Sequence, residues 1–341
     1  SGTAHDVIVI GGGASGMFAA GRAAEGGSRV LLLERTNRLG SKLAITGKGR
    51  CNLTNTDETA AFIENYGRNG KFLHRALREF SNRDLVAFFN SRGVPTQEER
   101  GGRIFPASGG SSGVVKALIG YMREGGVAVR LNARAQAIER DPETGAAAFV
   151  RVAGERRSIA ARKIILATGG LSYPATGSTG DGYAMAGALG HTIAPRRPAL
   201  VPLETVERFP TELQGLSLEN VEVTAFASGR KLAAEFGDML FTHFGVSGPI
   251  ILRMSGAVVE RHERGERIEL SINLKPALDE AKLDGRLLRE FAGAGTKTLR
   301  SAMKNVLPKA LIPVILGAVG IPADKKCNQI TSGERKALAG L

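Results

Sequence analysis

A glycine-rich turn near the N-terminus most constrains what this chain can fold into. Gly11, Gly13 and Gly16 form the spacing G-x-G-x-x-G directly after an apolar run, residues 7–10, and directly before a stretch of helical composition. The first glycine allows a tight turn, the second lets a diphosphate approach the backbone, and the third lets helix and strand pack closely. The N–H groups at a helix start attract the same anion. We therefore predict a βαβ nucleotide-binding unit.

A carboxylate stands where such a unit contacts a ribose. The second predicted strand covers residues 29–34 and ends in Glu34, eighteen residues after Gly16. At this spacing a carboxylate accepts hydrogen bonds from the hydroxyl groups of an adenosine ribose. It also repels a 2′-phosphate, so NADP is disfavoured at this site. An ordinary glycine-rich turn without a ligand is the alternative, and the combination of strand, glycines, helix and carboxylate disfavours it.

Two later glycine-rich turns favour FAD over NAD. Residues 166–170, L-A-T-G-G, end another apolar strand, and residues 179–186, T-G-D-G-Y-A-M-A, begin a predicted helix. They resemble the A-T-G segment of the flavoprotein superfamily with two dinucleotide-binding domains and the T-G-D-G-x-x-M-A segment of its succinate-dehydrogenase branch. The resemblance implies that Ala135, after the third strand, meets the adenine through its backbone. A helix N-cap is an alternative role for Asp181, compatible with one at the cofactor.

Two longer strings narrow the resemblance further. Residues 47–55 read G-K-G-R-C-N-L-T-N and residues 240–249 read L-F-T-H-F-G-V-S-G-P. Both resemble the bacterial YhiN-type flavoproteins, a family of NAD(P)/FAD-dependent oxidoreductases whose relatives include aminoacetone-oxidase-like enzymes and a bile-acid-ring reductase. The resemblance spans nearly the whole chain. It implies non-covalent FAD, an inserted β-rich domain and a helical subdomain.

The fold class predicted from these observations is α/β. A Rossmann-like FAD-binding domain is expected over residues 1–190, an inserted β-rich domain over 191–273, and a helical subdomain over 274–341. Members of the resembled family continue with a glycine-rich strand–helix return that caps the flavin, and this sequence contains no match to it. We therefore expect a weakened or empty FAD site and an open flavin pocket in this chain.

The predicted cofactor site joins the motif residues to loop cations. The resemblance implies that Arg50, Cys51 and Asn52 lie along the FAD. Lys42 and Arg50 can also neutralise phosphates in their own right, although a plain surface cation is an equally good interpretation of Lys42. Cofactor contacts are predicted for Gly11, Gly13, Ala14, Ser15, Gly16, Glu34, Arg35, Lys42, Gly49, Arg50, Cys51, Asn52, Ala135, Ala167, Thr168, Gly169 and Asp181.

The composition excludes several classes of protein. The formal charge is +13, but the positive residues are scattered, so a solvated basic surface is favoured over a nucleic-acid partner. The only cysteines, Cys51 and Cys327, are far apart, which excludes a disulfide framework and fits a reducing cytoplasm. The histidines do not cluster, so no metal site is expected. No apolar stretch reaches the ~20 residues that span a bilayer, so no membrane association is expected.

No catalytic residue is assigned. His243 is either a general acid or base or a structural histidine, and Cys51 lacks the nearby second thiol of a disulfide-reducing enzyme. A second G-x-G-x-x-G is absent, so NAD(P)H would bind transiently near the flavin, unless oxygen accepts the electrons.

We predict an FAD-dependent oxidoreductase whose small organic substrate binds between the FAD-binding and inserted domains. The alternatives are an FAD-binding RNA-modifying or RNA-binding protein, motivated by the net charge, and a flavoprotein without turnover. The sequence carries no signal for the oligomeric state.

Overall fold

The chain forms two compact units. The computed structural model describes residues 5–341, except the side chains at positions 68 and 147. One unit ends at Ala194 and the other spans Pro195–Leu341. Among the described residues, no helix is long and apolar enough to cross a membrane. The predicted three-domain boundaries stay predictions.

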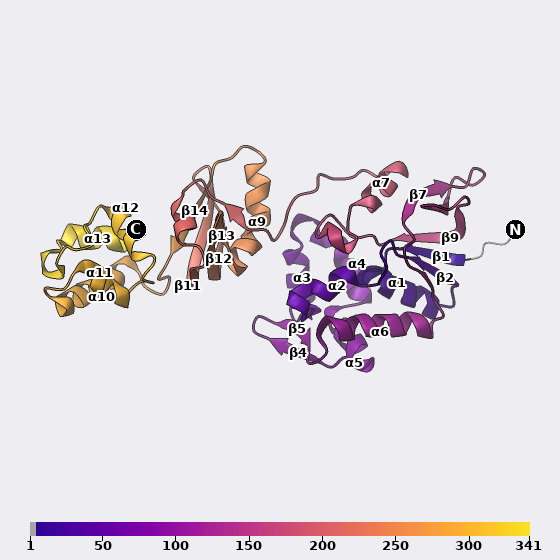
Figure 1. The fold of residues 1–341 in the computed structure, drawn as a ribbon, viewed down its shortest axis with the longest axis horizontal. Coiled ribbons are helices and arrows are strands. Elements are labelled where there is room, and N and C mark those ends of the chain that lie inside the picture. The colour runs from indigo at the N-terminus through magenta and orange to yellow at the C-terminus, as the bar shows by residue number, and fades with distance from the viewer. Residues whose placement is uncertain (1–4) are drawn as a thin grey trace. The chain divides into compact units, whose positions relative to one another are not determined.

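A six-stranded sheet forms the centre of the first unit (Figure 1). Its strand order is β6-β2-β1-β9-β8-β7; β6, β2, β1 and β9 are parallel, and β8 pairs antiparallel with both β7 and β9. The predicted α/β class with a Rossmann-like parallel sheet is confirmed. The strands are β1 His5–Ile10, β2 Val30–Leu33, β6 Ala128–Arg130, β7 Ala135–Arg140, β8 Ala147–Val152 and β9 Ile159–Leu166.

Both faces of β1 and β2 are buried, which explains their unbroken apolar sequences. Successive residues of a strand point to opposite faces. Val9 and Leu32 pack on one face with helices α1, Ala14–Glu25, and α6, Gly110–Glu124. Their neighbours along the strands pack on the other face with β7, β8 and α7, Asp181–Ala188. The glycine-rich turn is thereby held at the end of a doubly covered strand.

Strand β9 differs from the prediction. The sequence suggests two strands, over residues 157–160 and 163–167, and the structure has one. Ile159 and Ala160 pair antiparallel with β8, and from Ala161 onward the same strand pairs in parallel with β1. No turn residue separates the two stretches, so the chain stays extended while its pairing partner changes from β8 to β1.

The segment between β2 and α6 is mostly helical and contains a small sheet. Ser81 and Asp84 form a capping box, and the helix begins at Asn82. Within the glycine-rich stretch 101–113, Ile104 and Phe105 are buried in a strand of a three-stranded antiparallel sheet, order β3-β5-β4. The elements are α2 Ser41–Ile45, η1 Thr46–Gly49, β3 Thr54–Asn55, α3 Thr59–Asn65, η2 Gly67–Leu73, α4 His74–Glu79, α5 Asn82–Ser91, β4 Thr96–Glu99 and β5 Arg103–Pro106.

The second unit contains an antiparallel sheet followed by helices. Its strand order is β10-β13-β12-β11-β14, and the alternation of β11 buries Val221, Val223 and Ala225. The elements are β10 Leu203–Glu204, α8 Phe209–Glu212, β11 Ser217–Ala227, β12 Arg230–Thr242, β13 Gly245–Ser247, α9 Pro249–His262, β14 Ile268–Asn273, α10 Glu280–Ala294, α11 Leu299–Ala302, η4 Met303–Asn305, α12 Ile312–Val319, η5 Cys327–Gln329 and α13 Ser332–Gly340.

Gly16→Ala tests how closely α1 packs on the turn. A Cβ at Gly16 would lie 1.8 Å from the carbonyl oxygen of Gly11, so helix and strand must separate. We expect the free energy of unfolding to fall by about 1–3 kcal/mol, measured by guanidinium unfolding. The control is Gly120→Ala inside α6, where a Cβ meets no described atom within 4 Å and should stabilise by about 0.5–1 kcal/mol. Equal effects of the two substitutions would contradict this packing.

Candidate functional site

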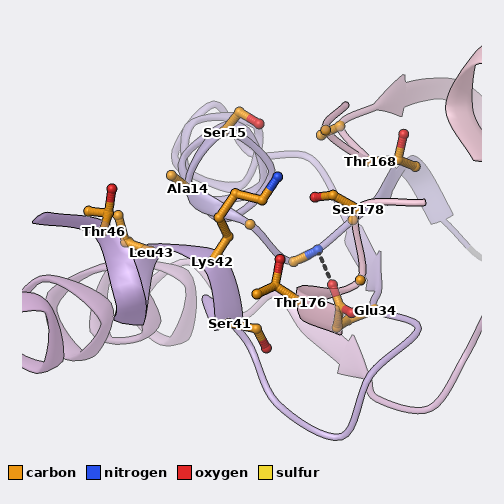
Figure 2. A pocket seen from close by; sticks show the side chains of 16 residues that line it. Ala14, Ser15, Glu34, Ser41, Lys42, Leu43, Thr46, Thr168, Thr176 and Ser178 are labelled. Atoms are coloured by element: carbon orange, nitrogen blue, oxygen red, sulfur yellow. Dashed lines mark hydrogen bonds between the residues drawn. The ribbon is translucent and has the colours of Figure 1, made fainter. Parts of the chain in front are cut away.

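A cavity of about 360 Å³ lies where β1 and β9 end and α1 begins (Figure 2). Its walls come from four segments: the glycine-rich turn, the end of β2 with α2, the turn after β9, and the loop before α7. The lining residues are Gly11, Gly12, Gly13, Ala14, Ser15, Glu34, Ser41, Lys42, Leu43, Thr46, Ala167, Thr168, Gly169, Thr176, Gly177 and Ser178.

The three motif glycines are required for different reasons. Gly11 has a φ of +111°, and a Cβ there would lie 2.4 Å from the carbonyl oxygen of Ala167. Gly16 allows the close contact with Gly11 described above. Gly13 has an ordinary φ of −80°, and no described atom lies within 4 Å of its Cβ position. The fold itself therefore does not require a glycine at position 13, and the open space there admits a ligand against the backbone.

The start of α1 and a lysine make this end of the cavity favourable for an anion. Gly13 is the N-cap, and no described side chain caps the helix or places an acid in its first turn. The first N–H groups therefore keep their partial positive charge. Lys42 extends from α2 over the cavity, and its Nζ donates to Ser172 Oγ at 3.1 Å. Burial lowers the pKa of Lys42.

Glu34 has a structural role that the sequence analysis missed. Its side chain is buried, and its Oε2 accepts from the N–H of Gly12 at 2.7 Å. Its Oε1 accepts from the N–H of Thr36 at 2.7 Å and from its hydroxyl at 2.8 Å. The carboxylate thus ties the end of β2 to the glycine-rich turn. A carboxylate oxygen can accept more than one hydrogen bond, so the contact with a ribose stays a prediction.

A cavity of about 40 Å³ adjoins the first and shares Gly11, Glu34, Thr168 and Gly177 with it. Its further lining comes from the ends of β1 and β2, from the start of β7 with the loop before it, and from α7. Those residues are Ile10, Leu33, Arg35, Ala133, Arg134, Ala135, Asp181 and Met185.

Asp181 is held by two arginines beside this smaller cavity. Arg134 donates to both carboxylate oxygens, at 2.9 and 3.3 Å, and Arg35 donates at 3.1 Å. The hydrogen bonds from Arg134, followed by one from Thr179, hold the pKa of Asp181 below its usual value. Gly180 with a φ of 83° occupies the N-cap and no described side chain caps the helix, so the N-cap interpretation of Asp181 is wrong.

The structure brings most of the predicted residues together. Gly16 packs against the backbone of Gly11 and lines neither cavity. Arg35, Ala135 and Asp181 meet at the smaller cavity. The larger one gathers Gly11, Gly13, Ala14, Ser15, Glu34, Lys42, Ala167, Thr168 and Gly169.

The G-R-C-N residues have other contacts. Gly49, Arg50, Cys51 and Asn52, all within the described chain, lie outside the lining of both cavities. Arg50 pairs with Glu99 and stacks on Phe105, and the Asn52 amide donates to the carbonyls of Thr54 and Ile104. Cys51 is fully buried, which raises its pKa to about 11 and keeps the thiol protonated. Their predicted place along the FAD stays a prediction.

Sequence reasoning missed several lining residues. Thr176 and Ser178 lie between two glycine-rich motifs in the sequence, and this position could have identified them as lining residues. Arg134 carried no signal, because its partner Asp181 is 47 residues away. His243 is exposed and contacts Phe244 edge-to-face. In the described residues, no group of three or more His, Cys, Asp or Glu is placed to hold a metal ion.

Comparison with known proteins decides the family. The family model described as "HI0933-like protein Rossmann domain" matches residues 5–321. The chain belongs to this family. It is an FAD-dependent oxidoreductase, and the resemblance to YhiN-type flavoproteins is confirmed. The open Gly13 backbone, the uncapped start of α1 and Lys42 fit the diphosphate of the flavin cofactor.

Two relatives are similar to this chain over most of its length. It is 32% identical to a 3-dehydro-bile acid delta(4,6)-reductase of Clostridium scindens over 90% of this chain and 74% of the relative. It is 31% identical to a ribosomal RNA dihydrouridine synthase of Escherichia coli over 98% of this chain and 78% of the relative. Among solved structures, a flavocytochrome c3 fumarate reductase is 20% identical with a TM-score of 0.45, covering 64% of this chain and 48% of that one.

Gly13→Ala separates ligand binding from folding. The φ at this position suits alanine, and a Cβ meets no described atom, so the free energy of unfolding should change by less than about 0.5 kcal/mol. The methyl group would separate a diphosphate from the backbone donors, so FAD affinity should fall about tenfold or more. Titration by flavin fluorescence measures this. Unchanged FAD affinity would contradict the assigned role of Gly13.

Asp181→Asn tests the clamp formed by Arg35 and Arg134. Because the pKa of Asp181 is lowered in the folded chain, its contribution to stability is present above the usual value of 3.8 and lost as pH falls through the lowered pKa. The wild-type chain should be more stable by about 1 kcal/mol at pH 7, and the difference should narrow only as pH falls below about 4. Urea unfolding at several pH values measures it.

The control for this substitution is Asp324→Asn in the second unit. The Asp324 carboxylate is exposed and forms no ion pair with a described residue. A stability difference for Asp181→Asn that is independent of pH would show that the ion pairs do not carry the effect.

Proposed function

We propose that the FAD diphosphate binds at the Gly13 backbone and the start of α1, with the adenosine reaching toward the smaller cavity. The open space at Gly13 is the observation that supports this most, because Gly11 and Gly16 are required by packing and Gly13 is not. The shared lining of the two cavities gives one continuous surface for a long ligand. Glu34, Arg35, Ala135 and Asp181 border the adenosine end.

The residues of this site then have separate tasks. Backbone N–H groups at the start of α1 and the Lys42 ammonium neutralise the diphosphate. Glu34 keeps the glycine-rich turn in place through Gly12, and its remaining lone pairs accept from a ribose. Asp181 is fixed between Arg35 and Arg134. When bound, FAD supplies two-electron transfer.

We infer that the reaction is the reduction of a carbon–carbon double bond conjugated to a carbonyl group. A delta(4,6)-reductase of a 3-dehydro bile acid saturates ring double bonds beside a ketone, and a dihydrouridine synthase produces a base whose ring double bond is saturated beside a carbonyl. The two relatives are nearly equally similar to this chain, at 32% and 31% identity. Their shared chemistry is therefore better supported than either substrate.

Two substrate classes follow from the same relatives. A small organic enone is favoured by the bile-acid reductase, which fits the expectation from the sequence. A uracil base in RNA is favoured by the dihydrouridine synthase, whose similarity extends over 98% of the chain, and by the net charge of +13. In both classes the product gains two electrons and two protons. We propose that a nicotinamide dinucleotide, docking transiently, supplies the electrons.

Anaerobic spectroscopy of the FAD-reconstituted chain tests this function. NADH or NADPH should bleach the flavin absorbance, and a 3-keto-4-ene steroid or a uridine-containing RNA should restore it. The matched controls are the saturated steroid and an RNA carrying dihydrouridine at the same position. Reoxidation by oxygen alone would contradict the reductase, and a chain that shows no flavin absorbance after FAD addition would contradict the cofactor site.

A further inference from the structure

Positive charge in the second unit is concentrated in its last 68 residues. Residues 195–273 contain nine Lys and Arg against eleven Asp and Glu, whereas residues 274–341 contain twelve against six. Within residues 291–333 there are six Lys and Arg, and Asp324 is the only acid. Residues 274–341 therefore carry a net charge of +6, whereas residues 195–273 carry −2.

Two backbone segments bring several of these cations together. The N–H of Leu299 donates to the carbonyl of Lys325 at 2.8 Å, and the N–H of Cys327 donates to the carbonyl of Lys297 at 3.0 Å. Thr298 and Lys326 form an antiparallel bridge between the two segments. Lys297, Arg300 and Lys326 thus stand at neighbouring positions of paired backbone, and we call these three residues the basic patch.

The cations of the basic patch have no counter-ion among the described residues, and buried residues lie next to them in the sequence. All three side chains are exposed, and none forms an ion pair with any described residue. The adjacent Lys325, in contrast, is bound by Glu334 at 2.5 Å. Leu299 and Cys327, the sequence neighbours of Arg300 and Lys326, are buried in the core of the unit. Clustered like charges repel one another, so the fold holds them together without an internal counter-ion.

We propose that the basic patch binds the phosphate backbone of RNA. Exposed cations held at neighbouring backbone positions complement the regular negative charge of a nucleic acid. No aromatic residue occurs in residues 292–341 to stack on bases, so the contact is expected to be with the phosphates and independent of sequence. The choice of RNA over other polyanions rests on the proposed function, in which a uracil base is one of the two substrate classes.

Charge-neutralising variants of the full chain test this proposal. Lys297→Gln/Arg300→Gln/Lys326→Gln removes the basic patch, and Arg156→Gln/Arg157→Gln/Lys163→Gln removes the same charge from exposed positions of the first unit. The probe is a fluorescent RNA hairpin with a uridine-rich loop, followed by anisotropy. Removing the patch should weaken binding about a hundredfold at 0.1 M salt and lower the log–log salt slope by about 2–3, while the control changes affinity within about threefold.

Three results would overturn the proposal. They are an equal loss of affinity in both variants, unchanged affinity without the patch, and tighter binding of phosphatidylserine vesicles than of the RNA at the same salt. Circular dichroism and thermal unfolding identify a variant that fails to fold, and single substitutions at Lys297 and Lys326 then replace the triple variant. Because the binding assay needs no turnover, a wild-type chain that binds RNA through the patch but reduces no double bond contradicts only the proposed function.

Discussion

The contact between Gly16 and Gly11 is the constraint on which the site depends. A Cβ at Gly16 would lie 1.8 Å from the carbonyl oxygen of Gly11, and a Cβ at Gly11 would lie 2.4 Å from that of Ala167. Three backbone segments, from α1, β1 and β9, therefore meet with no side chain between them. This meeting places the positive end of a helix beside the ends of two parallel strands, where a cavity opens.

Glu34 connects that packing to electrostatics. By accepting from the N–H of Gly12 and from Thr36, the carboxylate fixes the turn whose next residue, Gly13, is open to a ligand. A buried carboxylate needs such partners. The same residue thus supports the fold and borders both cavities. At the smaller cavity, Arg35 and Arg134 pair with Asp181, and together with Glu34 the lining contains two cations and two carboxylates.

The parts of the fold and site that follow from local sequence could be predicted. The glycine spacing, the apolar runs of β1 and β2 and the capping box at Ser81 each depend on residues close together in the chain. The continuity of β9, the small sheet around Ile104 and the ion pairs of Asp181 depend on partners far away in sequence, so local patterns did not indicate them. The functional interpretation of Arg50 likewise rested on resemblance, whereas its contacts are with Glu99 and Phe105.

The structure of the chain bound to FAD tests the central claim most directly. The account predicts diphosphate oxygens within about 3 Å of the N–H groups of Gly13, Ala14 or Ser15, which is the ordinary hydrogen-bond distance. It also predicts that the backbone of the turn moves little, because packing already fixes Gly11 and Gly16. A diphosphate bound away from the start of α1 would contradict the account.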